Sequence, residues 1–461
     1  MSKQSGTGHR WASAGTFVLL LMGLVIGPSV PAYGEASTER HWGAPLQPAV
    51  VIYLPYIAAS FAPELVASLQ PVDGIAPNQV DALLGLAGSP HTLIVTTENK
   101  GAQCGGGTPA SVWKITLDPL TKRALGVVHK QLLDGTQTTR QSLFESTDGT
   151  LFTGGGWCGF TPPYYSTDQG ESWHAADAGA VYPPNSTFSF AELNGAVYAG
   201  TGYDPYPAEV YRWLGAGQWE KVFTSPFPLR NLMATMITFH GRMFVAPQIY
   251  GSGFCEGTTA VYVTSDGTTF LPTTGIPPCE NTWKFMLVGN NLVAYVFNRD
   301  PYKNTSLYRW DERTETWVKL ADYQGIMQWG NAGKPMAAYA ETIYGYGRAL
   351  PDGAWGLYRS TDLGLTWELI VPFASPPITA IAGYEGDLYF ATGSDALGAV
   401  SLYRLWMSPP YPNMISKTGA ESASGGGQVD VIDQDLFAIS SSTTGNAEAT
   451  SATLYLPIVH R

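Results

Sequence analysis

Charged residues are scarce in this sequence: Lys, Arg, Asp and Glu together make up 13% of its 461 residues. Basic residues are the scarcer kind, so the net charge is −12, and no basic run is interleaved with aromatic residues. Nucleic-acid-binding surfaces need clustered positive charge, which this chain does not offer. An acidic balance of this size is typical of a soluble extracellular surface. We therefore predict that the protein has no nucleic-acid partner.

Motifs for metals, nucleotides and the common nucleophiles are also missing. The seven histidines show no ligand spacing, and the chain has neither a C-x-x-C pair nor a G-x-S-x-G turn. The glycine runs at 105–107 and 154–156 lie between expected strands, whereas a phosphate-binding loop needs a helix after it. We therefore predict no metal site and no cofactor.

Long apolar runs are absent except near the N-terminus. There Lys3 and Arg10 precede an apolar run from Thr16 to Ile26, and small residues recur between positions 32 and 36. The run is shorter than a membrane span needs, and the small residues suit cleavage of a secretory signal. We predict a signal peptide over residues 1–34. The mature protein would then be secreted or held at the cell surface, with no membrane span after cleavage.

Glycine (52 residues), proline (33 residues) and aromatic residues (12%) are abundant. Past the N-terminus no stretch keeps a 3.6-residue apolar period, so long helices are not expected. Instead, short runs of β-branched and aromatic residues lie between Gly, Asn and Asp, which is the pattern of strands bounded by turns. These runs lie at 92–97, 149–154, 195–200, 241–246, 291–296, 341–346 and 386–391.

One eight-residue motif, S-x-D-x-G-x-[ST]-W, occurs at 166–173 and at 360–367, and degenerate copies end at Trp219, Phe270 and Trp317. The aromatic residues that close the five copies are 46, 51, 47 and 50 residues apart. A period of this size is typical of a four-stranded propeller blade. Asp and Ser oxygens can accept hydrogen bonds from turn N–H groups, glycine permits positive φ, and the Trp can cover the turn. We predict a structural role for the motif residues Asp168, Gly170, Trp173, Asp266, Asp311, Trp317, Asp362, Gly364 and Trp367.

The motif and its period resemble the Asp-box (bacterial neuraminidase repeat) β-propellers, a sialidase- and sortilin-like superfamily, over about residues 80–407. Together with the seven strand runs, the resemblance implies an all-β fold, which we predict to be a seven-bladed β-propeller of four-stranded antiparallel blades. The expected propeller covers 81–407 and follows an N-terminal segment at 35–80. After it we expect a Ser/Gly/Thr-rich linker at 408–452 and a short C-terminal strand motif at 453–461.

The last repeat has no fourth strand of its own, because prolines follow soon after Trp406. A strand from elsewhere in the chain should complete this blade and remove its exposed sheet edge. We expect Val50–Leu54 in this position, within the N-terminal segment. The alternative is Leu454–Val459 from the C-terminal motif.

The chain has four cysteines, and export would allow them to form disulfides. In the blade scheme, Cys104, Cys158 and Cys255 lie in connections between second and third strands, and Cys279 lies in a connection between blades. Both kinds of connection belong to one face of a propeller, which we call the loop face. Three pairings are possible, and the scheme favours Cys104–Cys158 and Cys255–Cys279.

The loop face usually forms the ligand pocket of a propeller, whereas the repeated motif belongs to the opposite face. Aromatic rings there can stack on sugars, and arginines from different blades can bind a carboxylate or a phosphate. The predicted ligand-binding residues are Trp157, Tyr203, Arg230, Tyr250, Arg299, Trp329 and Arg348.

The leading hypothesis is a secreted, non-catalytic, monomeric propeller that binds an extracellular glycan or protein ligand on the loop face. The alternative, which the resemblance implies, is a sialidase-like exo-acting glycoside hydrolase with carboxylates drawn from Glu256, Glu280 and Asp300. Sialidases carry an Arg-Ile-Pro motif near the start, and this chain has none. Two carboxylates close together at the axis would favour the hydrolase.

Overall fold

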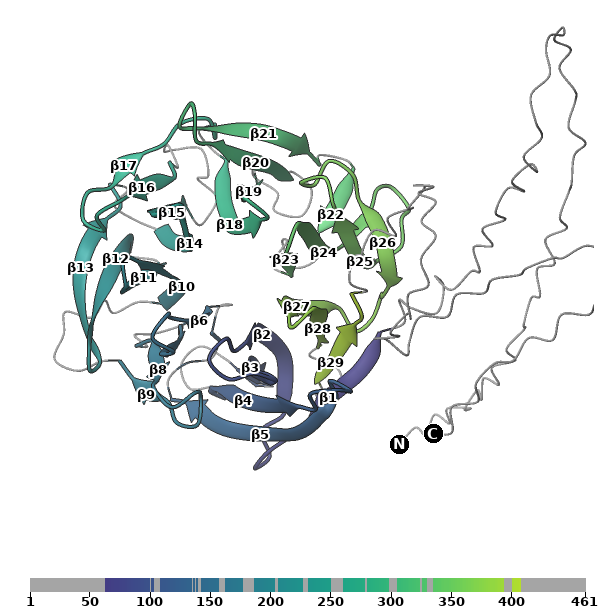
Figure 1. The fold of residues 1–461 in the computed structure, drawn as a ribbon. Coiled ribbons are helices and arrows are strands. Elements are labelled where there is room, and N and C mark those ends of the chain that lie inside the picture. The colour runs from purple at the N-terminus through teal and green to yellow at the C-terminus, as the bar shows by residue number, and fades with distance from the viewer. Residues whose placement is uncertain are drawn as a thin grey trace, which may run out of the picture. The chain divides into compact units, whose positions relative to one another are not determined.

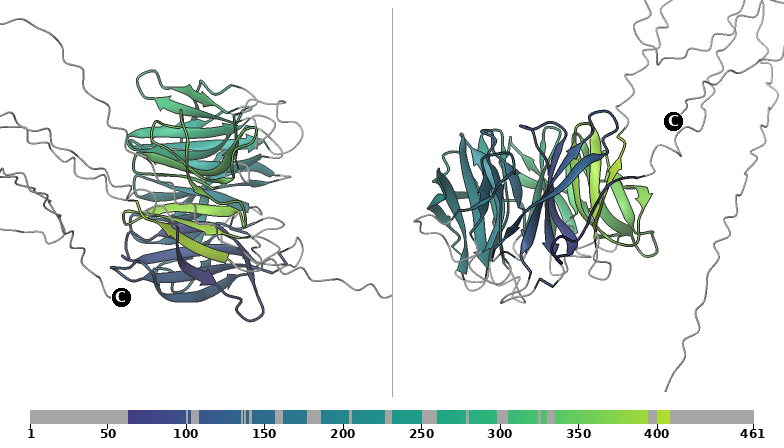
Figure 2. Two further views of the ribbon diagram at one scale, coloured as in Figure 1. Left: turned by 90° about the vertical axis from the view of Figure 1, so that its right-hand side faces the viewer. Right: turned by 90° about the horizontal axis from the view of Figure 1, so that it is seen from below.

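The computed structural model describes residues 63–407, with gaps at 100, 103–107, 135, 137, 140–141, 157–161, 177–185, 204–205, 227–230, 250–259, 278–279, 298–304, 324–325, 330–334 and 394–399. The prediction of an all-β fold is confirmed over the described residues, because their regular elements are strands. The sheets stand side by side around a central axis, seen end-on in Figure 1 and from the side in Figure 2. This is the arrangement of a β-propeller.

Five of the six sheets are single antiparallel blades. The first contains β2 (Pro77–Gly85), β3 (Thr92–Asn99), β4 (Ala110–Leu117) and β5 (Ala124–Leu133). The second contains β6 (Leu143–Glu145), β7 (Leu151–Thr153), β8 (Tyr164–Ser166) and β9 (His174–Ala175). The third contains β18 (Asn281–Val288), β19 (Asn291–Phe297), β20 (Thr305–Asp311) and β21 (Thr316–Asp322). The fourth contains β22 (Met327–Trp329), β23 (Met336–Tyr339), β24 (Thr342–Ala349), β25 (Gly356–Ser360) and β26 (Glu368–Pro372). The last contains β27 (Ile378–Tyr384), β28 (Asp387–Thr392), β29 (Val400–Leu405) and β1 (Glu64–Leu69).

The sixth sheet has eight strands. They are β10 (Ser186–Leu193), β11 (Ala196–Tyr203), β12 (Tyr206–Gly215), β13 (Gln218–Thr224), β14 (Asn231–Phe239), β15 (Arg242–Ile249), β16 (Tyr262–Thr264) and β17 (Leu271–Pro272). The pairing of Gly202 with Leu232 joins β11 to β14 and makes the sheet continuous.

The prediction of seven four-stranded blades is therefore wrong. The described strands form five blades, one of them five-stranded, and one eight-stranded sheet. The repeat period counts units along the chain. It cannot show whether backbone hydrogen bonds join two neighbouring units into one sheet.

Apolar side chains fill the spaces between neighbouring sheets. Phe244 of β15, for example, packs with Phe285 of β18 and with Trp317 of β21 in one buried cluster. The rings of Phe285 and Trp317 are stacked, with centroids 5.7 Å apart. Large aromatic side chains bury much apolar area, so neighbouring sheets stabilise one another.

The two complete copies of the repeated motif form the turns between β8 and β9 and between β25 and β26. Asp168 accepts hydrogen bonds from the backbone N–H and the hydroxyl of Ser172, at 2.9 and 2.5 Å. Asp362 accepts the same two bonds from Thr366, at 2.9 and 2.6 Å. Burial would raise the pKa of Asp168, but the hydrogen bonds outweigh burial and lower this pKa to about 2. Both carboxylates therefore accept hydrogen bonds from residues of their own turns.

The last blade is completed by β1, which pairs antiparallel with β29. The expectation that Val50–Leu54 fills this position is wrong, because β1 occupies it. Val50–Leu54 and the alternative Leu454–Val459 lie outside the described residues. The exposure pattern of β1 does not alternate, and its register shifts between Leu65 and Ala67. Because a strand of this kind lacks the period of two, the sequence did not identify it.

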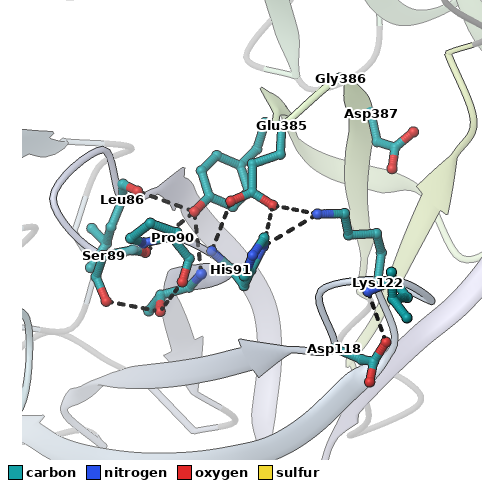
Figure 3. Close-up of polar contacts among 12 residues, drawn as sticks. Leu86, Ser89, Pro90, His91, Asp118, Lys122, Glu385, Gly386 and Asp387 are labelled. Atoms are coloured by element: carbon teal, nitrogen blue, oxygen red, sulfur yellow. Dashed lines mark hydrogen bonds and ion pairs between the residues drawn. The ribbon is translucent and has the colours of Figure 1, made fainter.

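Side chains in the turns of the first and last blades also meet, as Figure 3 shows. The carboxylate of Glu385 accepts a hydrogen bond from the backbone N–H of His91 at 2.8 Å. It also lies 2.7 Å from Nδ1 of His91 and 2.7 Å from Nζ of Lys122. Tyr384, the preceding residue, donates to the carbonyl of Leu86 at 3.1 Å. These contacts join residues 263 to 298 positions apart and hold the ring closed.

We predict that Glu385→Gln removes a pH-dependent part of the stability. Burial would raise the pKa of Glu385, but Lys122 and His91 lower it from 4.5 to about 2. A lowered carboxyl pKa stabilises the fold fully above about pH 4.5, and this contribution is lost as the pH falls toward 2. At pH 7 the variant should lose about 2 kcal/mol of unfolding free energy in urea titrations. Glu341→Gln, at an exposed turn residue, is the control, and an equal loss there would contradict the prediction.

Candidate functional site

Most residues predicted for the loop face lie outside the described residues. They are Cys104, Trp157, Cys158, Arg230, Tyr250, Cys255, Glu256, Cys279, Arg299 and Asp300. The two disulfides and the roles of the other six residues stay predictions. Tyr203 ends β11, where its backbone pairs with Tyr206. Side-chain contacts are described for Glu280, Trp329 and Arg348.

Trp329 was predicted to contact a ligand, and this prediction is wrong. Its side chain is 0% exposed. The ring centroid lies 4.6 Å from that of Trp367 and 5.8 Å from that of Tyr323, both in edge-to-face contact. Trp329 is therefore a core residue of its blade, and a bound sugar cannot stack on it.

Glu280 accepts a hydrogen bond from the Tyr308 hydroxyl at 2.6 Å. Glu280 was a candidate carboxylate of the hydrolase alternative, so the surroundings of this pair matter. Tyr308 is 2% exposed, and burial first and Glu280 second raise its pKa above the ordinary value. A nucleophilic tyrosine needs a lowered pKa and access to substrate. This pair therefore fits a structural role in the blade of β18–β21.

Arg348 lies at the end of β24 that leads to the connection with β25, which places it on the loop face. Its Nε donates to Oε1 of Gln328 on β22 at 2.9 Å. The guanidinium carbon lies 5.4 Å from the ring centroid of Trp355, and that ring lies 5.3 Å from Tyr346. A guanidinium is attracted to an aromatic face. Gln328 and Trp355 together therefore orient the Arg348 side chain.

Arg348 differs from most described arginines in its partners. Six of the eight described arginines form ion pairs with carboxylates: Arg123, Arg212, Arg242, Arg313, Arg359 and Arg404. No described carboxylate pairs with Arg348, whose only described hydrogen bond uses Nε. The eighth, Arg309, lies on the third strand β20. The terminal nitrogens of an oriented guanidinium can bind a planar carboxylate through two parallel hydrogen bonds.

A second polar group lies at the same face, in the blade of β2–β5. Nε2 of Gln79 donates to Glu98 at 3.1 Å and lies 3.5 Å from Asp81. Asp81 also accepts from the Thr138 hydroxyl at 2.7 Å and from the Thr139 N–H at 2.8 Å, and it is 5% exposed. Two carboxylates thus approach one amide. Because Asp81 is buried and binds Thr138 and Thr139, the group joins two blades and does not form a catalytic pair.

Sequence reasoning found Arg348 but missed Gln328, which orients it. A single glutamine in a strand carries no pattern, and its role depends on a strand pairing that only the fold supplies.

Within the described ranges, no helix is long and apolar enough to cross a membrane. The same residues include no group of three His, Cys, Asp or Glu side chains that could hold a metal ion.

No family model matches this chain, and no curated protein sequence matches it. Among solved structures, the chain is similar to YCF48 bound to D1 peptide, with 15% identity and a TM-score of 0.48, over 76% of this chain and 99% of that one. It is also similar to the computationally designed Ika8 protein, with 11% identity and a TM-score of 0.43, over 74% of this chain and 99% of that one. The functional argument therefore rests on the residues of this chain.

Proposed function

We propose that the protein is an exported, non-catalytic propeller that binds a glycan or protein ligand on its loop face, with Arg348 as the central contact. The proposal rests on the orientation and the partners of the Arg348 guanidinium. It is oriented by Gln328 and Trp355, and no described carboxylate neutralises it. An arginine held in this way is suited to a ligand carboxylate, which an acidic sugar or an acidic peptide can supply.

The surroundings of Arg348 indicate what else the ligand would contact. Trp355 is half-buried and leaves part of its ring open, while Asp352 in the same connection is exposed. An aromatic ring beside a charged group suits a ligand with one apolar face and one anionic group. We therefore expect the carboxylate to lie next to an apolar ring or side chain of the ligand.

The purified protein should be screened on an array of acidic and neutral glycans, and against a library of acidic peptides. We expect binding to one class, weakened roughly tenfold to a hundredfold by Arg348→Met, as for the loss of a charge-assisted hydrogen bond. Arg313→Met is the matched control, because Arg313 is 85% exposed and lies 3.9 Å from Asp311 on the opposite face. Equal effects of the two substitutions would contradict the proposal. Turnover of fluorogenic glycosides would favour the hydrolase instead.

A further inference from the structure

Third strands of several blades carry a basic residue at the same position, and a carboxylate lies beside it. Arg212 of β12 and Arg359 of β25 each lie opposite a glutamate of the fourth strand, which is Glu220 or Glu368. Nη2 of Arg212 lies 2.5 Å from the carboxylate of Glu220, and Nε of Arg359 lies 2.9 Å from that of Glu368. The repeat therefore places a cross-strand carboxylate next to this arginine.

Lys114 of β4 has the same position and takes its carboxylate from the next blade. The residue opposite Lys114 on the fourth strand is Val128, which is apolar. Nζ of Lys114 lies 2.7 Å from Glu171, the sixth residue of the repeated motif in the neighbouring blade. A carboxylate can therefore reach this position from two places, the fourth strand of the same blade and the motif of the next one.

Arg309 of β20 has a carboxylate at neither place. The residue opposite it on β21 is Val318, and the sixth residue of the motif in the next blade is Leu365. Val318 and Leu365 are 41% and 58% exposed, and Arg309 is half-buried. No described residue forms an ion pair or a hydrogen bond with the Arg309 side chain. Arg309 is therefore the member of this series whose charge the described residues leave unpaired.

The Arg309 side chain faces the motif of the neighbouring blade, which adjoins its own blade in Figure 1. Leu307 and Arg309 are two residues apart on β20 and so share one face of the sheet. Leu307 packs in one cluster with Trp367 of that motif. Asp311, two residues further along the same face, accepts the N–H of Arg313 in its own turn at 3.0 Å. Arg309 therefore lies beside exposed apolar side chains on a face where the repeat elsewhere provides a glutamate.

We propose that Arg309, Val318 and Leu365 form a docking site for an extended acidic segment of a partner protein. A carboxylate of that segment would pair with Arg309, as the glutamates of other blades pair with the equivalent cations. Apolar side chains two residues to either side would cover Val318 and Leu365, because alternate residues of an extended segment share a face. Both flanking side chains are aliphatic, so they suit a peptide and offer no aromatic ring to a sugar.

This site is separate from that of Arg348. Arg309 lies near the end of β20 that leads to the turn with β21, on the face of the repeated motif, whereas Arg348 lies on the loop face. The docking site therefore does not depend on the ligand proposed for Arg348, and substitutions can test the two independently.

The test uses the full chain and an array of capped pentapeptides with a central Glu and an apolar residue at each end. The same peptides with a central Gln, and a set of acidic glycans, complete the array. We expect a subset of the Glu peptides to bind about tenfold or more tightly than their Gln counterparts. Arg309→Met should remove this difference. Arg359→Met, at the equivalent position of the next blade, and Arg348→Met should leave it unchanged.

Val318→Glu tests the site without removing Arg309. The new carboxylate would lie opposite Arg309, as Glu220 lies opposite Arg212, so it should compete with the peptide and weaken binding about tenfold or more. Leu365→Glu should act in the same way, by the geometry of Lys114 and Glu171. Urea titration checks that each variant is folded.

The proposal is overturned if no Glu peptide binds better than its Gln counterpart, or if Arg309→Met and Arg359→Met have equal effects. Unchanged binding in folded Val318→Glu would also contradict it. Loss of the peptide in Arg348→Met would assign the binding to the loop face instead. Glycan binding that depends on Arg309, without peptide binding, would show that the partner is not an acidic peptide.

Discussion

Arg404→Met should destabilise the protein by about 3–5 kcal/mol, the range expected when one partner of a buried ion pair is removed. Arg404 is 1% exposed, and its Nη2 lies 2.6 Å from the carboxylate of Glu64 on β1. Its Nη1 donates to the carbonyl of Thr121 at 2.8 Å and lies 3.7 Å from Asp387. The substitution would remove the ion-pair partner of Asp387 and leave Glu64 paired with Arg123 alone, at the junction that closes the ring.

The environment of Asp387 shows why this loss is costly. Burial raises the pKa of Asp387 above its ordinary value, and Arg404 opposes that rise. Without Arg404, the carboxylate would be desolvated with less compensation. The effect should appear as a lower midpoint in urea or thermal unfolding, together with easier proteolysis of β1.

Arg212→Met provides the matched control, because Arg212 holds the same Tyr-Arg position in an earlier repeat. Its ion pair with Glu220 is more open, with side chains 36% and 49% exposed. Exposed pairs contribute at most about 1 kcal/mol, so Arg212→Met should be mild. If both variants lose the same stability, the ring-closing role of Arg404 is wrong.

Gly364→Ala should cost about 3 kcal/mol or more, through two separate effects. Gly364 has φ of +89°, a conformation that costs a residue with Cβ roughly 1–2 kcal/mol. In addition, the new Cβ would lie 2.2 Å from Cδ1 of Leu307 and 2.6 Å from the Tyr323 hydroxyl oxygen. Relieving such overlap in a packed core costs roughly another 1–3 kcal/mol.

Gly386→Ala separates the two effects. Gly386 has φ of +85°, but a Cβ there would meet nothing within 4 Å. We expect this variant to show the conformational cost alone, so urea titrations should find it clearly more stable than Gly364→Ala. Equal stabilities would mean that the motif turn does not pack tightly against the preceding blade. The test therefore measures what the repeated motif contributes beyond its own hairpin.

Local patterns predicted the strands and turns well, for a physical reason. The hydrogen bonds of Asp168 and Asp362 join residues four positions apart, so turn chemistry is visible in the sequence itself. The same patterns were a poorer guide to the ligand-binding residues. Arg348 was predicted to bind a carboxylate or a phosphate, and its described hydrogen bond uses Nε and not the terminal nitrogens. Trp329, predicted with the same reasoning, is a core residue, because tryptophan suits a core and a binding surface equally.

The sequence by itself determined that the chain is all-β and that its turns recur at the period of a blade, because strand and turn preferences act over a few residues. Tertiary structure alone decided that β1 closes the last blade, that β11 joins β14 in one sheet, and that Trp329 is buried. Each of these depends on contacts between distant residues, such as Glu64 with Arg404, which are 340 positions apart. No local pattern records such contacts.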